Sequence, residues 1–259
     1  SAALGYTSVG IHRADLHDIL ARGFGDDSIR CNHELASVEE TGSGVRAGFT
    51  NGASSESDLL VGADGLKSKA RELVFGESPL RDAKQMCWRG VVDRSLLKNS
   101  EQVDSTTATE LWGRGIRFGY LFVNTNQIYW YAVMSAPLVD FSMEDLAQFR
   151  QTFTPNWNET VQNILNATPD ETIVAAPLMD RKPANVWHTD RIVMLGDAIH
   201  PTTPNMGQGA CLAVESAWAL AYCLSEESNP PAAFAFFHEM RAARTRMVTN
   251  QSFRIGGLA

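Results

Sequence analysis

Residues 191–210 read RIVMLGDAIHPTTPNMGQGA, and this stretch decides the fold. It begins with an apolar run that is short enough for a buried strand, and it continues through Gly196 and Asp197 into a loop that contains prolines. The glycines of GQG then precede the Ala- and Leu-rich segment 210–226, which is typical of a helix. The pattern predicts a strand, a loop and a helix start, with Asp197 at the carboxyl end of the strand.

Each part of this stretch has a property that suits a bound cofactor. Ligands of open α/β sheets lie beyond the carboxyl ends of the strands, so Asp197 is expected to reach a ribose-like or ribityl hydroxyl. Gly207 and Gly209 lack side chains and let a ring approach the backbone. A helix that begins near Ala210 presents free N–H groups, which suit the negative charge of a reduced flavin. The alternative is an ordinary strand, an Asx turn and a glycine-rich helix cap without a ligand.

A second strand with a similar ending lies earlier in the chain. The segment DLLVGADG at 58–65 ends in an acidic residue and a glycine, and helical spacing follows at 66–74. Residues 85–139 are β-rich and aromatic instead, and IRFGYLFV and IYWYAVM around the turn NTNQ predict a hairpin. Helical spacing returns over 143–168 with an interruption at Pro155. The two α/β segments are therefore expected to share one sheet, with the β-rich section inserted between them.

Apolar spacing and turn residues predict the remaining elements. They are a helix over 11–22, strands over 37–40, 45–50 and 57–61, and helices over 210–226 and 234–248.

Composition limits the classes of protein to consider. With 259 residues, of which 44% are hydrophobic and 20% charged, the chain can bury a sizeable core. Its net charge of -8 opposes binding to nucleic acid. Four scattered cysteines without a CxxC pair indicate neither a metal site nor a disulfide framework, and they favour a cytoplasmic setting. No apolar run reaches the ~20 residues of a membrane span, and SAALGYTSVG lacks the features of a signal peptide, so no membrane anchor is expected.

The stretch GDAIHPTTPNMGQGACLAVESA resembles the GD motif of the para-hydroxybenzoate hydroxylase family of FAD-dependent monooxygenases. The wording PTTPNMGQGAC is especially similar to the urate hydroxylase and zeaxanthin epoxidase branch. The resemblance implies that Asp197 binds the flavin ribityl chain and that residues 207–209 and the helix start line the isoalloxazine ring. It places Pro204 beside the flavin and the oxygen site, as the candidate catalytic residue.

Two further segments are similar to motifs of the same family. DLLVGADGLKSKAR resembles the DG motif, which implies that Asp64 lies near the flavin pyrophosphate and the NAD(P)H path. IHRADLHDIL resembles a segment whose arginine contacts the flavin phosphate or ribityl region, and Arg13 is the candidate. An ordinary surface charge and an ordinary strand-end turn are the alternatives. The cofactor-binding residues implied by the resemblance are Arg13, Asp64, Gly196, Asp197, Pro204, Gly207, Gln208, Gly209 and Ala210.

Some residues leave two interpretations open. His200 fits a general base or a structural hydrogen-bonding group. The run Tyr129-Trp130-Tyr131 fits a pocket wall or the core, and both can hold because alternate side chains of a strand face opposite sides.

The chain also departs from the family pattern at two places. It contains no GxGxxG unit, so the resemblance implies that it begins about a hundred residues into a typical member. Ser216 stands where Glu-Asp is common after the helix begins.

The resemblance implies a mixed α/β fold. A Rossmann-like FAD/NAD(P)-binding domain, incomplete at its N-terminus, is expected from residues 1–80 and 170–259, and an antiparallel β-sheet substrate domain from 81–169. The implied activity is that of an FAD-dependent monooxygenase, which uses NAD(P)H as a transient reductant. It would hydroxylate or epoxidise a small aromatic or heterocyclic substrate with O2 through a flavin hydroperoxide. The alternatives are a truncated or degenerate flavoprotein fragment that binds FAD weakly without catalysis, and a related halogenase or reductase.

Overall fold

The computed structural model describes residues 10–25, 28–98, 103–136, 138 and 145–258. The expected features at Val139 and at the start of the 143–168 segment lie outside these residues. The described residues form two compact units. Unit 1 contains those of 1–29 and 84–177, and unit 2 contains 30–83 and 178–258.

The two units differ from the expected domains at the N-terminal end of the chain. Residues 10–25 belong to unit 1, together with the β-rich section, whereas the domain prediction grouped residues 1–80 with the C-terminal segment. The functional assignment of the two domains stays a prediction.

Unit 2 is built on a parallel pair of short strands. In this pair β4 (Leu60–Gly62) lies beside β10 (Ile192–Met194), with Val61 opposite Val193. All three residues of β10 are buried, which explains the continuous apolar run in the sequence. This pairing confirms that the two α/β segments share a sheet.

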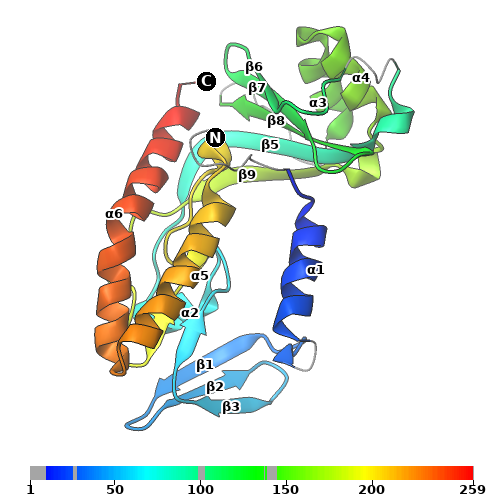
Figure 1. Ribbon diagram of the computed structural model, residues 1–259. Coiled ribbons are helices and arrows are strands. Elements are labelled where there is room, and N and C mark those ends of the chain that lie inside the picture. Colours follow the sequence, from blue (N-terminus) through cyan, green and yellow to red (C-terminus); the bar gives the residue numbers. More distant parts are fainter. Residues whose placement is uncertain (1–9, 26–27, 99–102, 137, 139–144, 259) are drawn as a thin grey trace. The chain divides into compact units, whose positions relative to one another are not determined.

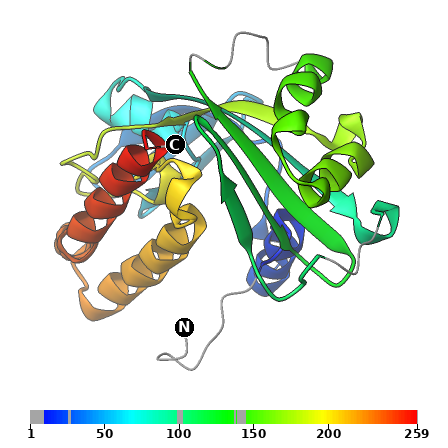
Figure 2. The ribbon, with the colours of Figure 1, turned by 90° about the horizontal axis from the view of Figure 1, so that it is seen from above.

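Two long helices pack side by side in unit 2, as Figures 1 and 2 show. They are α5 (Gly209–Glu226) and α6 (Pro230–Gly256). The helix predicted over 210–226 is confirmed, and the last helix is longer than its predicted span of 234–248. Its first residue is a proline, which helices tolerate because the first N–H groups have no intrahelical partner. The unit's core contains Trp187, Val193, Met194, Ile199, Leu220, Cys223, Phe234 and Phe237.

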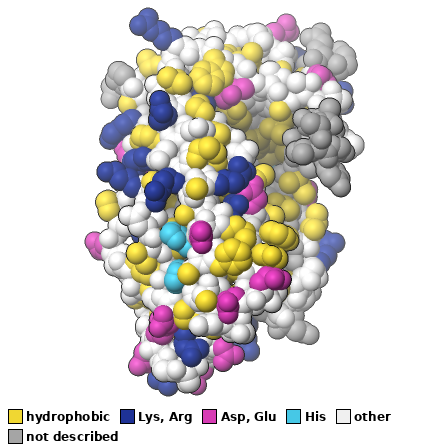
Figure 3. All heavy atoms as spheres, turned by 60° about the vertical axis from the view of Figure 1, so that its left-hand side comes forward, with side chains coloured by type: hydrophobic (Ala, Val, Ile, Leu, Met, Phe, Trp, Pro, Cys, Tyr) yellow, Lys and Arg dark blue, Asp and Glu magenta, His cyan; other side chains and the backbone are white. Residues whose placement is uncertain are grey.

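The outer surface of this helix pair carries exposed aromatic side chains. Trp218 is 67% exposed, and its ring stacks on that of Tyr222 at 5.5 Å. Figure 3, which brings α6 forward, shows hydrophobic side chains among acidic and basic ones on this face.

A small antiparallel sheet completes unit 2. Its strands are β1 (Leu35–Glu40), β2 (Val45–Phe49) and β3 (Ser54–Ser57), and the helix α2 (Lys69–Phe75) follows β4. The first two strands confirm the prediction, but the strand predicted over 57–61 was wrong at its start. The structure ends β3 at Ser57 and begins β4 at Leu60. All four residues of β3 are exposed, so this strand leaves no apolar alternation in the sequence.

Unit 1 contains most of a five-stranded sheet with the order β6-β7-β8-β5-β9. Its strands are β5 (Arg81–Asp93), β6 (Thr109–Trp112), β7 (Ile116–Phe122), β8 (Gln127–Ser135) and β9 (Val174–Asp180), and the boundaries between the units fall inside β5 and β9. The predicted hairpin is confirmed by the antiparallel pairing of β7 and β8. Asn124 Oδ1 accepts hydrogen bonds from the backbone N–H groups of Asn126 and Gln127, which fixes the turn.

Helices cover one face of this sheet (Figure 2). They are α3 (Leu146–Phe153) and α4 (Glu159–Ala167), and Pro155 lies in a 3-10 turn between them, as the interrupted spacing predicted. Trp130 and Phe118 are fully buried against these helices. The helix predicted over 11–22 is α1 (Arg13–Phe24) of unit 1.

Candidate functional site

The two motifs singled out in the sequence meet at the carboxyl edge of the parallel strand pair. The backbone N–H of Leu195, directly after β10, donates to the carbonyl of Gly62 at the end of β4 at 2.8 Å. Ala63 and Asp64 therefore leave the sheet beside Gly196 and Asp197. Because ligands bind beyond the carboxyl ends of parallel strands, this edge is the expected place for a cofactor.

A groove of about 530 Å³ opens at this edge of unit 2. Its lining is mostly backbone and small side chains, which leaves room for a flat group to approach the main chain. The lining residues are Ala63, Gly65, Leu195, Gly196, Asp197, Thr202, Pro204, Gly207, Gly209, Ala210 and Ala213.

Asp197 supplies the only carboxylate in this lining. It sits in a single 3-10 turn, Gly196–Ala198, which is possible because Gly196 has a φ of +59°. Within the described residues, no hydrogen bond or ion pair is made by this carboxylate. Desolvation by the surrounding protein raises the pKa of Asp197, although solvent reaches its side chain. The group is thus an acceptor that is available to a ligand hydroxyl.

The groove also contains the start of α5. Gly207 adopts the left-handed conformation, with a φ of +62°, and an added Cβ there would meet nothing within 4 Å. Gln208 precedes the helix without capping it through its side chain. Among the described residues no side chain caps the first N–H groups of α5, which carry the positive end of the helix dipole.

Residues 196–207, here called the GD loop, are braced by α6. Thr203 Oγ1 and Ser252 Oγ lie 2.9 Å apart, and Asn205 Nδ2 donates to the carbonyl of Ser252 at 2.9 Å. Thr203 and Ser252 are both buried. These bonds hold the part of the loop that carries Pro204.

His200 is a second brace, and the structure favours its structural interpretation. The ring is 4% exposed, and its Nε2 lies 3.0 Å from the hydroxyl of Ser216 in α5. Burial lowers the pKa of His200 to about 4, and the nearby Arg241 cation adds to this effect. A buried neutral imidazole with a side-chain partner is poorly placed to exchange protons with a ligand.

The remaining predicted residues lie outside the groove lining or in the other unit. Asp64 Oδ2 accepts hydrogen bonds from the N–H groups of Lys69 and Ala70, so it satisfies the first donors of α2 beside the N-cap residue Ser68. Gln208 Oε1 accepts a bond from Arg244 at 3.4 Å. Arg13 begins α1 in unit 1 and is exposed. The groove thus brings together six of the nine predicted residues, namely Gly196, Asp197, Pro204, Gly207, Gly209 and Ala210.

Several residues of the site were not predicted from the sequence. Ala213 lies one helical turn after Ala210 in α5, and this spacing was the signal that could have found it. Thr202 and the backbone of Ala63 and Gly65 also line the groove. Arg181, which is distant in sequence, donates from Nη2 to the carbonyl of Leu66 at 3.2 Å and so holds the loop after β4.

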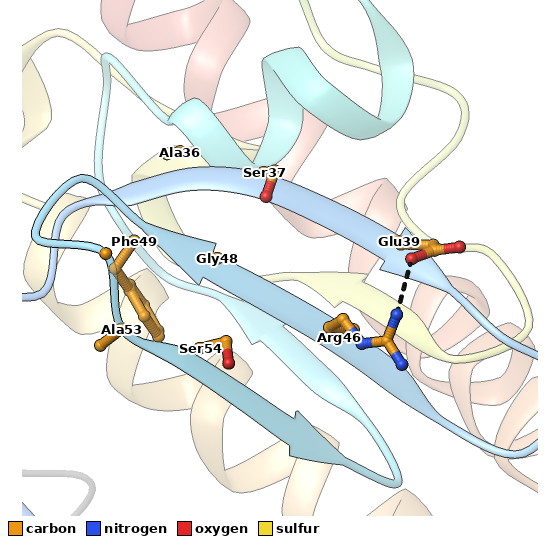
Figure 4. A pocket seen from close by; sticks show the side chains of 9 residues that line it. Ala36, Ser37, Glu39, Arg46, Gly48, Phe49, Ala53 and Ser54 are labelled. Carbon is orange, nitrogen blue, oxygen red and sulfur yellow. Dashed lines mark hydrogen bonds and ion pairs between the residues drawn. The ribbon is translucent and has the colours of Figure 1, made fainter.

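A second hollow, of about 330 Å³, lies on the three-stranded sheet of unit 2 (Figure 4). It contains none of the predicted residues. Its cation, Arg46, forms ion pairs with Glu39 at 3.3 Å and with Glu56 at 2.9 Å, and all three side chains are exposed. The one cation among the described residues of the hollow is therefore already paired and exposed to solvent, and the groove at the strand ends is the stronger candidate.

Unit 1 contributes a polar and aromatic face on the side of its sheet away from α3 and α4. Tyr129 and Tyr131 project from β8 on this side, with ring centroids 6.3 Å apart, whereas Trp130 projects into the core. Gly119 of β7 lies opposite Tyr131, and a Cβ there would come within 2.2 Å of the ring. Burial raises the pKa of Tyr129 to about 12. The core interpretation of this aromatic run is therefore confirmed for Trp130, whereas the pocket-wall interpretation stays a prediction for Tyr129 and Tyr131.

Metal-ligand clusters and membrane-spanning helices are both absent from the described residues. No group of three His, Cys, Asp or Glu side chains is arranged to hold a metal ion there. None of the helices in the same residues combines the length and the apolar character that crossing a bilayer requires.

Comparison with known proteins identifies the family. The sequence matches the FAD binding domain family over residues 14–252. The aurachin C monooxygenase/isomerase of Stigmatella aurantiaca is 37% identical over 257 residues, which are 99% of this chain and 66% of that protein. The chloroplastic zeaxanthin epoxidase of Arabidopsis thaliana is 34% identical over 217 residues, 83% of this chain and 32% of that protein.

A solved structure agrees with these relatives. The crystal structure of Klebsiella pneumoniae HpxO complexed with FAD and uric acid is 28% identical, with a TM-score of 0.85, and the match covers 95% of this chain and 63% of that chain. The chain thus spans about two thirds of the length of the Stigmatella enzyme and of HpxO, and about a third of the epoxidase. Because the family match covers most of the sequence, the chain belongs to the FAD binding domain family, together with flavin-dependent monooxygenases such as these.

Proposed function

We propose that this chain contributes the cofactor-binding and β-rich parts of an FAD-dependent, NAD(P)H-consuming monooxygenase. Its substrate would be a small aromatic or heterocyclic molecule that is hydroxylated or epoxidised with O2. The observation that carries the proposal is the Asp197 carboxylate, which faces the groove without a partner among the described residues. This carboxylate is partly desolvated and has no protein hydrogen bond among the described residues, so it can accept a hydrogen bond from a ligand hydroxyl.

The groove fits the flavin half of FAD. Asp197 would accept a hydrogen bond from a ribityl hydroxyl, and the uncapped start of α5 would receive negative charge that develops on the ring. The Cβ position of Gly207 is open, and a Cβ at Gly209 would meet only Thr202 Cγ2 at 3.5 Å, so a planar ring can lie on the backbone. Asp64 would act indirectly, by fixing the loop after β4, because its carboxylate already accepts a hydrogen bond at the start of α2.

FAD, when bound, supplies hydride acceptance from NAD(P)H and oxygen activation. The residues of this chain would bind the flavin, orient it and exclude water from its surroundings. Pro204 has no N–H and would present only ring carbons to the groove, so it limits the access of water without donating a proton. The braces from α6 to Thr203 and Asn205 keep Pro204 in this place.

The polar and aromatic face of unit 1 is the proposed contact surface for the substrate. Tyr129 and Tyr131 offer ring faces for an aromatic molecule and hydroxyl groups for its polar edge. Both hydroxyls stay protonated near neutral pH, and burial raises their pKa values further above the ordinary value of about 10. HpxO was crystallised with uric acid, so purines belong among the compounds to be tested first.

Titration of the purified polypeptide with FAD tests the cofactor part of the proposal. Binding should quench the flavin fluorescence, and the protein should keep absorbance near about 450 nm after gel filtration. A polypeptide that stays colourless at every FAD concentration would rule out cofactor binding by this chain alone.

Turnover is tested separately on the FAD-loaded protein. NAD(P)H oxidation is measured with phenols, purines and heteroaromatic acids, and 18O2 is used to trace the transferred oxygen atom. We expect substrate-stimulated oxidation and one labelled oxygen in the product. FAD binding without labelled product from any compound would instead support the flavoprotein fragment without catalysis.

A further inference from the structure

A chain of buried polar groups connects the GD loop to α5 and α6. His200 Nε2 lies 3.0 Å from Ser216 Oγ, and Arg241 Nε donates to the same oxygen at 3.2 Å. Arg241 also forms an ion pair with Glu215 at 2.8 Å, which Arg244 contacts at 2.7 Å. Ser216 is fully buried, and His200 and Arg241 are 4% and 7% exposed. His200 therefore contacts an uncharged hydroxyl, that of Ser216, which in turn is bonded to the Arg241 cation.

The hydrogen-bonding capacity of each group decides where the protons lie. Arginine can only donate, so the oxygen of Ser216 accepts from Arg241 and its own hydrogen is left to donate. A neutral His200 accepts that hydrogen on Nε2, so this ring nitrogen, the Ser216 hydroxyl and Nε of Arg241 each have a partner. A protonated His200 would have to donate to an oxygen that already accepts from a cation.

The groups around His200 give a protonated ring little compensation. Ser216 and Glu215 face it from α5, Arg241 faces it from α6, and the Trp187 ring lies 5.4 Å from its centroid. Glu215 is the one carboxylate among these groups, and two arginines already share it. Burial lowers the pKa of His200 to about 4, which agrees with this geometry.

The backbone transmits this arrangement to the groove. The N–H groups of Ile199 and His200 both donate to the carbonyl of Gly196, at 3.0 and 2.9 Å. The turn that carries Asp197 is thus closed by the residue whose ring Ser216 holds. A charged and displaced imidazole would pull on this turn.

We propose that Ser216 is a positioning residue, which holds His200 uncharged and thereby keeps the turn at Gly196 and Asp197 in one geometry over the neutral pH range. The consequence for FAD rests on the proposed function, whereas the consequence for the loop does not. FAD affinity should then vary by less than about threefold between about pH 5.5 and 8.5, because no group of this brace titrates there.

The experiment uses NMR and FAD titration on the whole chain. Ser216→Asp places a carboxylate against His200 and should raise its pKa above the usual value of about 6.5, by the ordinary effect of an adjacent opposite charge. Ser225→Asp, on an exposed site of the same helix, is the matched control. Histidine ring signals and the amide signals of Gly196 and Asp197 are followed against pH, and His200→Gln assigns the ring.

In the wild type and the control we expect no His200 titration above about pH 5 and constant loop amides. In Ser216→Asp the NMR signals of the loop amides should change with pH at the same midpoint as the His200 ring signals. The Kd for FAD should differ about tenfold or more between pH values below and above that midpoint. If Ser216→Asp does not fold, Ser216→Ala is the alternative variant for testing the brace. Loss of the hydroxyl should then speed amide exchange of the loop about tenfold, with no effect at distant sites.

Two results would overturn the inference. One is a wild-type His200 that titrates near its ordinary pKa. The other is a Ser216 variant whose loop amides match the wild type at every pH. Failure of all variants and of the wild type to bind FAD, with the expected loop behaviour, would contradict only the proposed function.

Discussion

Asp64 Oδ2 accepts hydrogen bonds from the backbone N–H groups of Lys69 and Ala70, at 2.8 and 3.0 Å, across the loop that follows β4. One carboxylate oxygen therefore satisfies two free donors at the start of α2. The family resemblance assigned Asp64 to the surroundings of the flavin pyrophosphate, and the structure adds a role in folding. Substitutions at Asp64 and Asp197 should accordingly separate stability from cofactor binding.

Asp64→Ala should destabilise the protein without abolishing its fold. Loss of a helix-capping carboxylate costs about 1 kcal/mol, with a range of roughly 0.5 to 2 kcal/mol. Urea unfolding followed by circular dichroism measures this change. Asp190→Ala, at an exposed aspartate with no bond to the rest of the described protein, is the control and should leave the midpoint unchanged. Equal midpoints for both variants would show that the cap contributes nothing.

Asp197→Ala should leave stability unchanged and weaken the binding of FAD. Its carboxylate has no partner among the described residues and its pKa is raised by desolvation, so its removal should not lower the free energy of unfolding. Loss of a hydrogen bond to a charged group weakens binding by about 1.5 to 3 kcal/mol, or roughly 10- to 100-fold in the Kd for FAD. Fluorescence titration measures the Kd, again with Asp190→Ala as the control. An unchanged Kd would disprove the placement of the flavin at this groove.

The sequence could predict these sites to different extents for physical reasons. Strand β10 and the glycines of the GD loop carry local signals, an apolar run and residues without side chains, so their arrangement was predictable. The cap at Asp64 depends on the fold of the next five residues and could have been read as an Asx-type turn. The Arg181 bond to Leu66 joins segments 115 residues apart, and no local pattern encodes it. Strand β3 was missed because pairing with β2, rather than apolar alternation, makes it a strand.

The free energy of unfolding should decrease as the pH is lowered below the ordinary pKa of histidine. The pKa of His200 is lowered to about 4 in the folded chain, so between about pH 6.5 and 4 the unfolded chain binds more protons than the folded one. The unfolding free energy therefore rises with pH in this window, and by pH 4 about 3 kcal/mol is lost. Urea unfolding at several pH values measures the slope. His200→Gln should flatten it, and a variant with the wild-type slope would contradict the assignment.

Gly119→Ala tests the packing of the aromatic face in unit 1. A Cβ at this position would lie 2.2 Å from Cζ of Tyr131 and 2.4 Å from its Cε1, so the ring must move. Overpacking of this kind costs about 1 to 3 kcal/mol. The cost should shrink in a Tyr131→Ala background, because the added methyl group then fills space that the ring has left. A double-mutant cycle by thermal unfolding measures this coupling, and purely additive effects would show that Tyr131 does not need Gly119.

The ion pair between Arg81 and Asp180 should be among the most sensitive polar contacts of unit 2. Two parallel bonds of 2.8 Å join them, the Asp180 side chain is 0% exposed, and the Arg81 guanidinium lies 3.7 Å above the centroid of the Phe253 ring. Removal of one partner leaves the other charge buried alone, which costs about 3 to 5 kcal/mol. We therefore expect Arg81→Gln and Asp180→Asn each to lower the unfolding midpoint strongly, and Arg81→Met with Asp180→Leu to recover part of the loss. Arg46→Gln, which breaks exposed ion pairs with Glu39 and Glu56, is the matched control and should have little effect. Equal unfolding midpoints for all the variants would show that breaking the buried pair costs no more than breaking the exposed pairs.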